Sequence, residues 1–207
     1  MAMKSVLLAM TGASGAIYGL RLGKELLNSG AHLTILISAT GFQVIREETA
    51  IDFKGGSGDV LQALVTHFSP EPGRLDYFAE DDFFAPVASG SSAPDAMVIC
   101  PCTMGTLSRI ACGNSGTLLE RCADVMIKER RPLALVPRET PLSDIHLENM
   151  LKVSRMGVRI VPAMPAFYHR PESVDDLVAF VVGKTLDSLG IGNSLYKRWK
   201  GENDPRP

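Results

Sequence analysis

Apolar residues recur along the chain in short runs that alternate with longer segments of helical spacing. The short runs predict buried strands, and they cover residues 5–10, 33–37, 74–78, 96–100, 133–136 and 158–161. The helical spacing predicts helices at residues 16–27, 41–48, 60–68, 106–111, 118–130, 143–156 and 174–189. Strands that alternate with helices indicate a parallel sheet covered on both faces. We therefore expect an α/β fold with three layers.

The chain has 207 residues and shows no internal repeat or long linker, so we expect a single domain over 1–207. Its last segment, 193–207, is polar and contains the only tryptophan, Trp199. A domain of this size has little core left to receive a tryptophan from its tail. We therefore expect 193–207 to form a C-terminal arm that docks over a ligand site or on a neighbouring subunit.

Composition narrows the class of protein. Hydrophobic residues make up 45% of the chain and the mean hydropathy is +0.11, which excludes a disordered chain. The net charge of −2 offers no general attraction for nucleic acid or a membrane surface. The apolar runs are too short to span a bilayer and the first residues do not form a signal peptide, so we expect a cytoplasmic protein.

The four cysteines, Cys100, Cys102, Cys112 and Cys122, lack the paired spacing and nearby histidines of a zinc site. We expect reduced and mostly buried thiols. The acidic run 80–82 is interpreted as a solvated turn, so no metal site is predicted.

The first strand is followed by a turn of small residues, 11–16, that leads into a helix. Such a turn presents backbone N–H groups and the positive end of a helix dipole to a phosphate. Its glycines do not fit the G-x-G-x-x-G pattern of dinucleotide sites, and Ser38 stands where such a site has an acidic residue. The pattern favours a mononucleotide, with flavin ahead of nicotinamide.

Two further small-residue patches, 89–92 and 101–106, flank the strand predicted at 96–100. With the first turn they make three patches that we expect at the carboxyl ends of strands, where open parallel sheets bind ligands. Each patch taken alone is more often an ordinary turn or helix cap than a ligand site.

Arg138 and Glu139 follow the strand at 133–136, so they are expected at the same edge. A fixed guanidinium beside a carboxylate suits an anionic substrate whose reaction also moves protons, although an exposed ion pair is the simpler interpretation. Tyr168 lies in a proline-framed aromatic loop and is either a phosphate ligand or a packed aromatic.

Seven segments together resemble the UbiX-type flavin prenyltransferases. The resemblance runs over nearly the whole chain, is weakest at 51–85 and in the tail, and is most specific in KERRPL and PRETP. The matching segments are MTGASGA at 10–16, SGS at 89–91, CPCT at 100–103, AD at 123–124, KERRPL at 128–133, PRETP at 137–141 and PAFYHRP at 165–171.

The resemblance implies a flavodoxin-like (Rossmann-like) homo-oligomer, often a dodecamer, with active sites at subunit interfaces. It implies transfer of a dimethylallyl group from dimethylallyl phosphate to N5 and C6 of reduced FMN. The product is the prenylated FMN used by UbiD-type decarboxylases, including one in ubiquinone biosynthesis. Some members of the family were first described as decarboxylases.

By position, the resemblance assigns FMN contacts to Gly12, Ala13, Ser14, Ser38, Thr103, Met104, Gly105, Thr106 and Arg138. The dimethylallyl phosphate would be surrounded by Lys128, Arg138, Glu139, Tyr168 and Lys184. Ser14 and Glu48 would lie near the reacting edge of the flavin. Lys184 stands where many relatives have arginine, and a lysine keeps the charge but loses the bidentate fork.

The chemistry agrees with this assignment. Cleavage of an allylic C–O bond develops charge on phosphate oxygens, which Lys128, Arg138 and Tyr168 would stabilise without a metal. The aromatic flavin face would stabilise the allylic cation, assisted by the ring of Trp199. The proton lost from C6 would go to Glu139, to Glu48 or to the released phosphate. Two alternatives stay open: a flavin-binding or storage protein without activity, and a related FMN-dependent decarboxylase.

Overall fold

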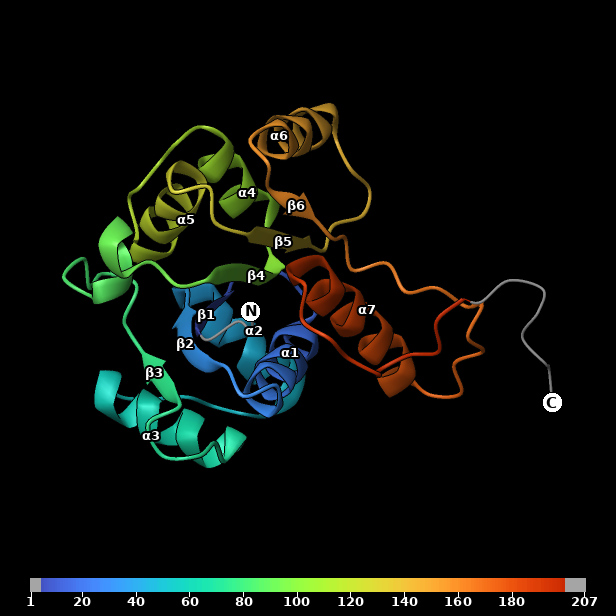
Figure 1. Ribbon diagram of the computed structural model, residues 1–207, viewed down its shortest axis with the longest axis horizontal. Helices are drawn as coiled ribbons and strands as arrows, with labels where there is room; N and C mark the ends of the chain where they lie inside the picture. The colour runs from blue at the N-terminus through green and yellow to red at the C-terminus, as the bar shows by residue number, and fades with distance from the viewer. Residues whose placement is uncertain (1–4, 200–207) are drawn as a thin grey trace.

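The computed structural model describes residues 5–199. Within them, six strands form one parallel sheet in the order β3-β2-β1-β4-β5-β6 (Figure 1). The strands are β1 Ser5–Met10, β2 His32–Ile37, β3 Leu75–Tyr77, β4 Ala96–Cys102, β5 Leu133–Pro137 and β6 Arg159–Ile160. The strand order reverses between β1 and β4, and a ligand crevice lies at such a reversal in doubly wound folds.

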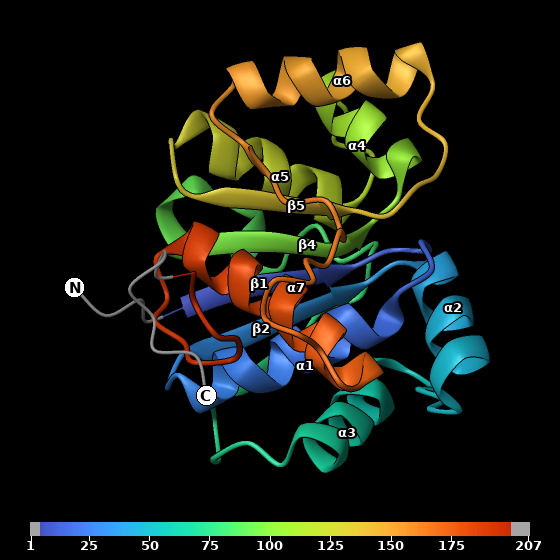
Figure 2. The ribbon, with the colours of Figure 1, turned by 90° about the vertical axis from the view of Figure 1, so that its right-hand side faces the viewer.

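Helices cover both faces of the sheet and make it the middle of three layers (Figures 1 and 2). One face packs against α1 Ala16–Asn28, α3 Ser57–Phe68 and α7 Val174–Leu189, and α2 Ala39–Thr49 lies at its carboxyl edge. The other face packs against α4 Met104–Ala111, α5 Leu118–Lys128 and α6 Asp144–Arg155. The predicted three-layer α/β fold is confirmed.

The central strands are buried over almost their full length, because helices shield both sides of them. Alternate residues of β1 divide between the two cores: Val6 and Leu8 face one, and Leu7 and Ala9 face the other. This explains why these strands appear in the sequence as continuous apolar runs.

Most predicted elements lie within two residues of their observed bounds, and the differences follow from local chemistry. The predicted helix 118–130 ends at Lys128, and Arg130 adopts a left-handed backbone conformation with φ 55°. Helix α3 begins at Ser57, three residues earlier than predicted, because Asp59 accepts a hydrogen bond from the Gly56 N–H and caps the first turn. The stretch before β4 contains two short 3₁₀ helices, Pro86–Ala88 and Gly90–Ser92.

Three of the four cysteines, Cys100, Cys102 and Cys122, are buried, and all four are free thiols, as predicted. Burial raises the pKa of Cys102 and Cys122 to about 12, so both thiols stay protonated at neutral pH. Among the described residues there is no helix long and apolar enough to cross a membrane.

The central position of β1 generates a stability prediction. Leu8→Ala removes a side chain that is fully buried in the core under α1. The cavity should lower the free energy of unfolding by about 2–5 kcal/mol. Chemical denaturation measures the change, and Gln62→Ala on α3 is the control because the Gln62 side chain is exposed. Equal stability of the two variants would contradict this account of the core.

Candidate functional site

The loops after β1 and β4 meet at the point where the strand order reverses. The buried hydroxyl of Thr11 donates to the Pro101 carbonyl oxygen over 2.9 Å and accepts from the Thr103 N–H over 2.9 Å. This single side chain therefore joins the turn 11–16 to the start of α4. The structure brings together two of the three small-residue patches that the sequence singled out.

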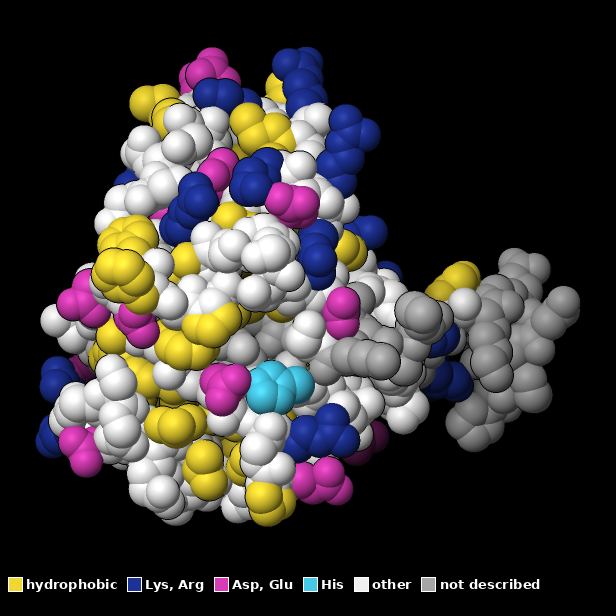
Figure 3. All heavy atoms as spheres, turned by 60° about the vertical axis from the view of Figure 1, so that its left-hand side comes forward, with side chains coloured by type: hydrophobic (Ala, Val, Ile, Leu, Met, Phe, Trp, Pro, Cys, Tyr) yellow, Lys and Arg dark blue, Asp and Glu magenta, His cyan; other side chains and the backbone are white. Residues whose placement is uncertain are grey.

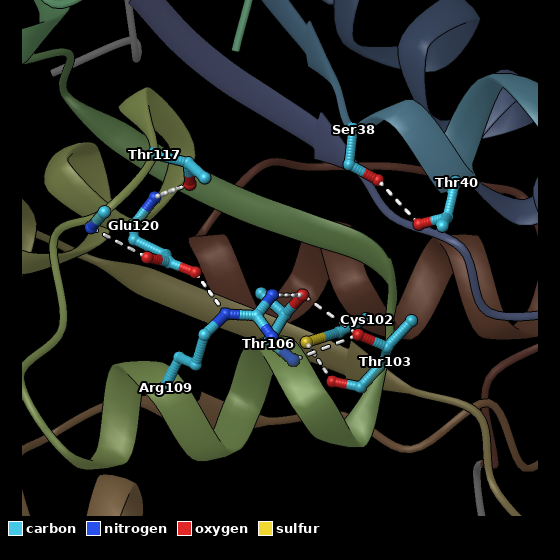
Figure 4. A network of polar contacts seen from close by, with 9 residues as sticks. Ser38, Thr40, Cys102, Thr103, Thr106, Arg109, Thr117 and Glu120 are labelled. Carbon is cyan, nitrogen blue, oxygen red and sulfur yellow. Dashed lines mark hydrogen bonds and ion pairs between the residues drawn. The ribbon is translucent and has the colours of Figure 1, made fainter. Parts of the chain in front are cut away.

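Gly12 is required by the close approach of α2. A Cβ atom at this position would overlap the side chain of Thr40 in the first turn of α2. Ser38 caps the same helix, because its hydroxyl accepts from the Gly41 N–H over 3.0 Å, and it lies 3.3 Å from the Thr40 hydroxyl (Figure 4). The turn 11–14 and the start of α2 thus form one tightly packed surface.

The N-terminus of α1 already holds an anion. One carboxylate oxygen of Glu48, on α2, accepts from the N–H groups of Gly15 and Ala16, both over 2.8 Å. This finding corrects the expectation that the whole turn presents free N–H groups to a phosphate, because these two groups are occupied. Burial by itself would raise the pKa of Glu48, but hydrogen bonds from Ser14, Gly15 and Ala16 and the charge of Arg138 hold it below the ordinary value.

Arg138 and Glu139 lie just beyond the carboxyl end of β5, as predicted. The Arg138 Nε donates to the Ser14 carbonyl oxygen over 3.1 Å, which ties the β5 loop to the turn after β1. Glu139 accepts from the Thr140 N–H over 3.1 Å and is half-buried. The two residues do not pair with each other, so the simple surface ion pair considered from the sequence is wrong.

An open cavity of about 630 Å³ lies beside these residues. Its polar wall contains Ser14, Glu48 and Arg138, and its apolar wall comes from α1, α7 and the loop after β6. The lining residues are Ser14, Gly15, Ile17, Tyr18, Leu20, Glu48, Thr49, Ile51, Arg138, Ala163, Val174 and Val178. A mostly apolar cavity with a few convergent polar groups is typical of a small-molecule site.

The start of α4 is supported by a network of polar contacts (Figure 4). Thr103 caps the helix by accepting from the Thr106 N–H, and its hydroxyl donates to the Thr106 hydroxyl over 2.9 Å. Arg109 donates to Thr106 and forms an ion pair with Glu120, which is only 2% exposed. The N–H groups of Met104 and Gly105 point out of the first turn, where a helix provides no acceptor of its own. They fit a phosphate or a polar ring edge.

Lys128 lies far from Arg138 within one chain. It ends α5, whereas β5 begins only at Leu133, so Lys128 is at the amino edge of the sheet. Its Nζ pairs with Glu129 over 2.6 Å and lies beside Gly90, where a Cβ atom would come within 3.0 Å of it. The patch 89–92 is at this same amino edge. The expectation that all three patches lie at carboxyl ends of strands is therefore wrong for 89–92, because that patch precedes β4 and does not follow a strand.

Tyr168 and Lys184 occupy a third place, on and beside α7. Tyr168 packs edge-on against Phe180, with ring centroids 5.9 Å apart, and against Trp199 at 5.8 Å. Lys184 lines a separate open cavity of about 510 Å³ with Phe180. The predicted site residues thus form three groups in one chain: the carboxyl edge, the α7 side and the amino edge.

The described part of the predicted arm, residues 193–199, folds back on α7 of its own chain. Asn193 donates to the Gly183 carbonyl oxygen over 3.1 Å, and Tyr196 packs against Phe180. Residues 193–199 therefore pack on α7, and docking of the arm over a ligand site or on a neighbouring subunit stays a prediction. Trp199 itself is 71% exposed, and residues 200–207 lie outside the described part of the chain.

Sequence reasoning missed several residues that shape the site. Glu120 and Arg109 support the 103–106 turn, and Glu80 accepts from the Ala39 N–H over 3.1 Å at the start of α2. Position 120 follows the helix cap Thr117 by three residues, which is a capping-box signal that was available. The positions of Glu80 and Arg109 depend on contacts between distant segments, and no local pattern marks them.

Comparison with known proteins decides the family. A Flavoprotein family model matches residues 1–186. The flavin prenyltransferase UbiX of Halalkalibacterium halodurans is 52% identical over 195 residues, which cover 94% of this chain and 93% of that protein. This chain belongs to the UbiX family of flavoproteins.

Two solved UbiX-type structures resemble the fold closely. AnUbiX (PadA1), solved in complex with FMN and dimethylallyl pyrophosphate, is 37% identical with a TM-score of 0.86, covering 96% of this chain and 98% of that one. A dodecameric FMN-dependent UbiX-like decarboxylase from Escherichia coli O157:H7 is 39% identical with a TM-score of 0.84, covering 95% of this chain and 100% of that one.

The close approach at Gly12 generates the next prediction. Gly12→Ala places a methyl group against Thr40 and must push the turn 11–14 away from α2. FMN affinity should fall by about tenfold or more, as expected when an overpacked site costs 1–3 kcal/mol. Fluorescence titration with FMN measures the change. Gly58→Ala on α3 is the control, because a Cβ atom there meets nothing within 4 Å.

Glu48 generates a prediction about pH. Its folded pKa is held below the ordinary value of 4.5, so its contacts stabilise the fold above about pH 4.5 and that contribution is lost as pH falls further. Glu48→Gln keeps a hydrogen-bond acceptor but does not titrate. Between pH 7 and pH 3.5 the wild type should therefore lose more unfolding free energy than Glu48→Gln, as measured by urea denaturation. Glu47→Gln, which alters an exposed neighbouring carboxyl, should follow the wild type.

Proposed function

We propose that this protein transfers a dimethylallyl group from dimethylallyl phosphate to N5 and C6 of reduced FMN. The observation that carries the proposal is the match to AnUbiX, which was solved with FMN and dimethylallyl pyrophosphate and superimposes on 96% of this chain. FMN, once bound and reduced, supplies the nucleophilic ring atoms, and the protein supplies position and charge.

The carboxyl edge fits the flavin. Gly12, Ala13 and Ser14 form the wall next to α2, Ser38 and Thr103 cap the two helices that begin there, and Arg138 contacts the Ser14 carbonyl oxygen. The start of α4, with Met104, Gly105 and Thr106, offers N–H groups to an anion. The cavity beside Ser14, Glu48 and Arg138 then holds the reacting edge, with its apolar wall for the dimethylallyl group.

The phosphate of the donor needs several cations, which stabilise the charge that develops as the C–O bond breaks. We assign this function to Lys128, Arg138 and Lys184, with Tyr168 as a hydrogen-bond donor. Lys128 and Arg138 lie at opposite edges of the sheet in one chain. One site therefore takes Lys128 from a neighbouring subunit, which agrees with active sites between subunits.

The proton released from C6 needs a base. Glu48 is anionic at neutral pH, and Ser14 donates a hydrogen bond to it, so the Ser14 hydroxyl can take the C6 proton while its own proton moves to the Glu48 carboxylate. Glu139 and the released phosphate are the other acceptors that the site offers. Glu48, Ser14, Glu139 and Lys128 are the residues to which we assign the chemistry.

An oligomer is supported by the surface. Hydrophobic side chains gather among charged ones on the face drawn in Figure 3, and Phe84, Phe167 and Met164 are 99%, 69% and 64% exposed. Exposed apolar side chains that lie together are typical of a surface that contacts another protein, and we assign them to contacts between copies of this chain. We propose a homododecamer that works in the cytoplasm, where free thiols persist, and passes prenylated FMN to a UbiD-type decarboxylase such as that of ubiquinone biosynthesis.

The decisive experiment is mass spectrometry of the flavin after reduction and incubation with dimethylallyl monophosphate or diphosphate. A mass increase of one dimethylallyl unit supports the proposal, and unmodified FMN would indicate a storage protein. Carbon dioxide release from an aromatic acid without flavin modification would indicate a decarboxylase.

Among residues 5–199 no group of three or more acidic, histidine or cysteine side chains is placed to hold a metal. We expect full activity in EDTA, and loss of activity that Mg²⁺ restores would contradict the metal-independent mechanism.

The split of Lys128 and Arg138 between subunits generates a complementation prediction. Lys128→Ala should retain FMN but transfer the dimethylallyl group about a hundredfold more slowly. Arg138→Ala should weaken both FMN retention and transfer. When the two variants are co-expressed with different tags and purified as mixed oligomers, some sites contain neither change, so activity should clearly exceed that of both parents. Activity no higher than the parental average would place the whole site in one chain.

A further inference from the structure

One carboxylate on α7 receives four side-chain hydrogen bonds from the C-terminal arm. Asp187 accepts from the Tyr196 hydroxyl over 2.5 Å, from the two terminal nitrogens of Arg198 over 3.0 and 2.7 Å, and from the Asn193 amide over 2.9 Å. All three donors come from the arm. Asp187 is thus the point on α7 at which four hydrogen bonds from residues 193–198 converge.

Two glycines, one within α7 and one at its end, leave room for the arm to pack against the helix. Gly183 lies one turn before Asp187, and a Cβ atom there would come within 2.6 Å of the Tyr196 ring and 2.9 Å of the Asn193 side chain. Gly190, with φ 77°, ends α7 and lets the chain turn back along it. Leu195 and Tyr196 then pack against the core. Residues 191–198 are therefore held in a defined position against α7 by packing and hydrogen bonds.

The pKa shifts of Asp187 and Tyr196 agree with strong hydrogen bonds between α7 and the arm, and we call this set of contacts the Asp187 clamp. Burial would raise the pKa of Asp187, but the hydrogen bonds from Arg198 and Tyr196 hold it below its ordinary value. Burial, followed by the bond to Asp187, raises the pKa of Tyr196 to about 12, so this phenol remains a donor. Arg198 also lies over the Tyr196 ring, 5.4 Å from its centroid. The guanidinium is thus held by a carboxylate and an aromatic face together.

The next residue after Arg198 is Trp199, and its ring packs edge-on against Tyr168. Tyr168 also contacts Phe180 on α7. The geometry points to Asp187 as a positioning residue: by fixing Arg198 it places Trp199 against Tyr168 and so orders the aromatic side of the allylic phosphate site. This inference rests on the proposed function, because Tyr168 is assigned there to the donor phosphate. Asp187 acts through the arm and touches no substrate in this account.

The arm itself can be followed without measuring activity, because Trp199 is the only tryptophan in the chain. In the FMN-loaded protein, Asp187→Ala should lower the fluorescence anisotropy of Trp199, because the indole then moves with a released chain end. Arg198→Ala should lower the anisotropy as well, because it removes the two Arg198 hydrogen bonds to Asp187 without altering α7. Asp175→Ala is the matched control, since Asp175 is another α7 carboxylate that pairs with an arginine, Arg21, away from the arm. It should match the wild type.

Kinetics test the link to the reaction. Asp187→Ala and Arg198→Ala should raise KM for dimethylallyl monophosphate about tenfold, the effect of losing one hydrogen bond to a charged group, and leave FMN affinity unchanged. Asp187→Asn, which keeps the acceptor oxygen, should recover part of the loss.

The outcomes separate the two proposals. Unchanged Trp199 anisotropy in both variants overturns the clamp, and a freed Trp199 with an unchanged KM overturns its function in positioning. If the wild type makes no prenylated FMN, the proposed function fails together with the positioning function, and the Trp199 signal still decides whether Asp187 holds the arm.

Discussion

The hydroxyl of Thr11 is the interaction on which the candidate site depends. It is buried between the two loops that leave β1 and β4, donates to one of them and accepts from the other. A buried hydroxyl that satisfies both functions fixes geometry strongly, because breaking either bond leaves an unpaired polar group away from water. The turn 11–14, the start of α4 and the Arg138 contact to Ser14 are all positioned relative to this junction.

Two helix termini at the same edge are treated differently. The N-terminus of α1 is neutralised by Glu48 from within the chain, whereas the start of α4 is supported from behind by Thr103, Thr106 and Arg109 and keeps its first N–H groups outward. The carboxylate of Glu48 already compensates the positive end of the α1 dipole. In the proposed function, α1 with its internal carboxylate therefore serves the chemistry at the cavity, and the start of α4 is left for ligand phosphate.

The distribution of the charged residues explains why a single chain is an incomplete enzyme in the proposed function. Parallel strands bring Arg138 to one edge, and the crossover helix α5 returns Lys128 to the other. No side-chain movement spans a sheet, so the two cations meet only between subunits. The arm clamped by Asp187 adds a third part, with Trp199 beside Tyr168 at the surface, where a neighbouring chain is able to complete the site.

The sequence by itself determined the alternation of strands and helices, the three-layer class, the buried thiols and the placement of Arg138 and Glu139 after β5. These follow from periodicity and from short-range chemistry, which act over a few residues. Only the tertiary structure decided that the patch 89–92 lies at the amino edge, that Glu48 caps α1 from α2, and that the arm returns to Asp187. Each of these is a contact between segments far apart in the sequence. Such contacts depend on strand order and on where the chain reverses direction, and neither property has a signal within a short stretch of sequence.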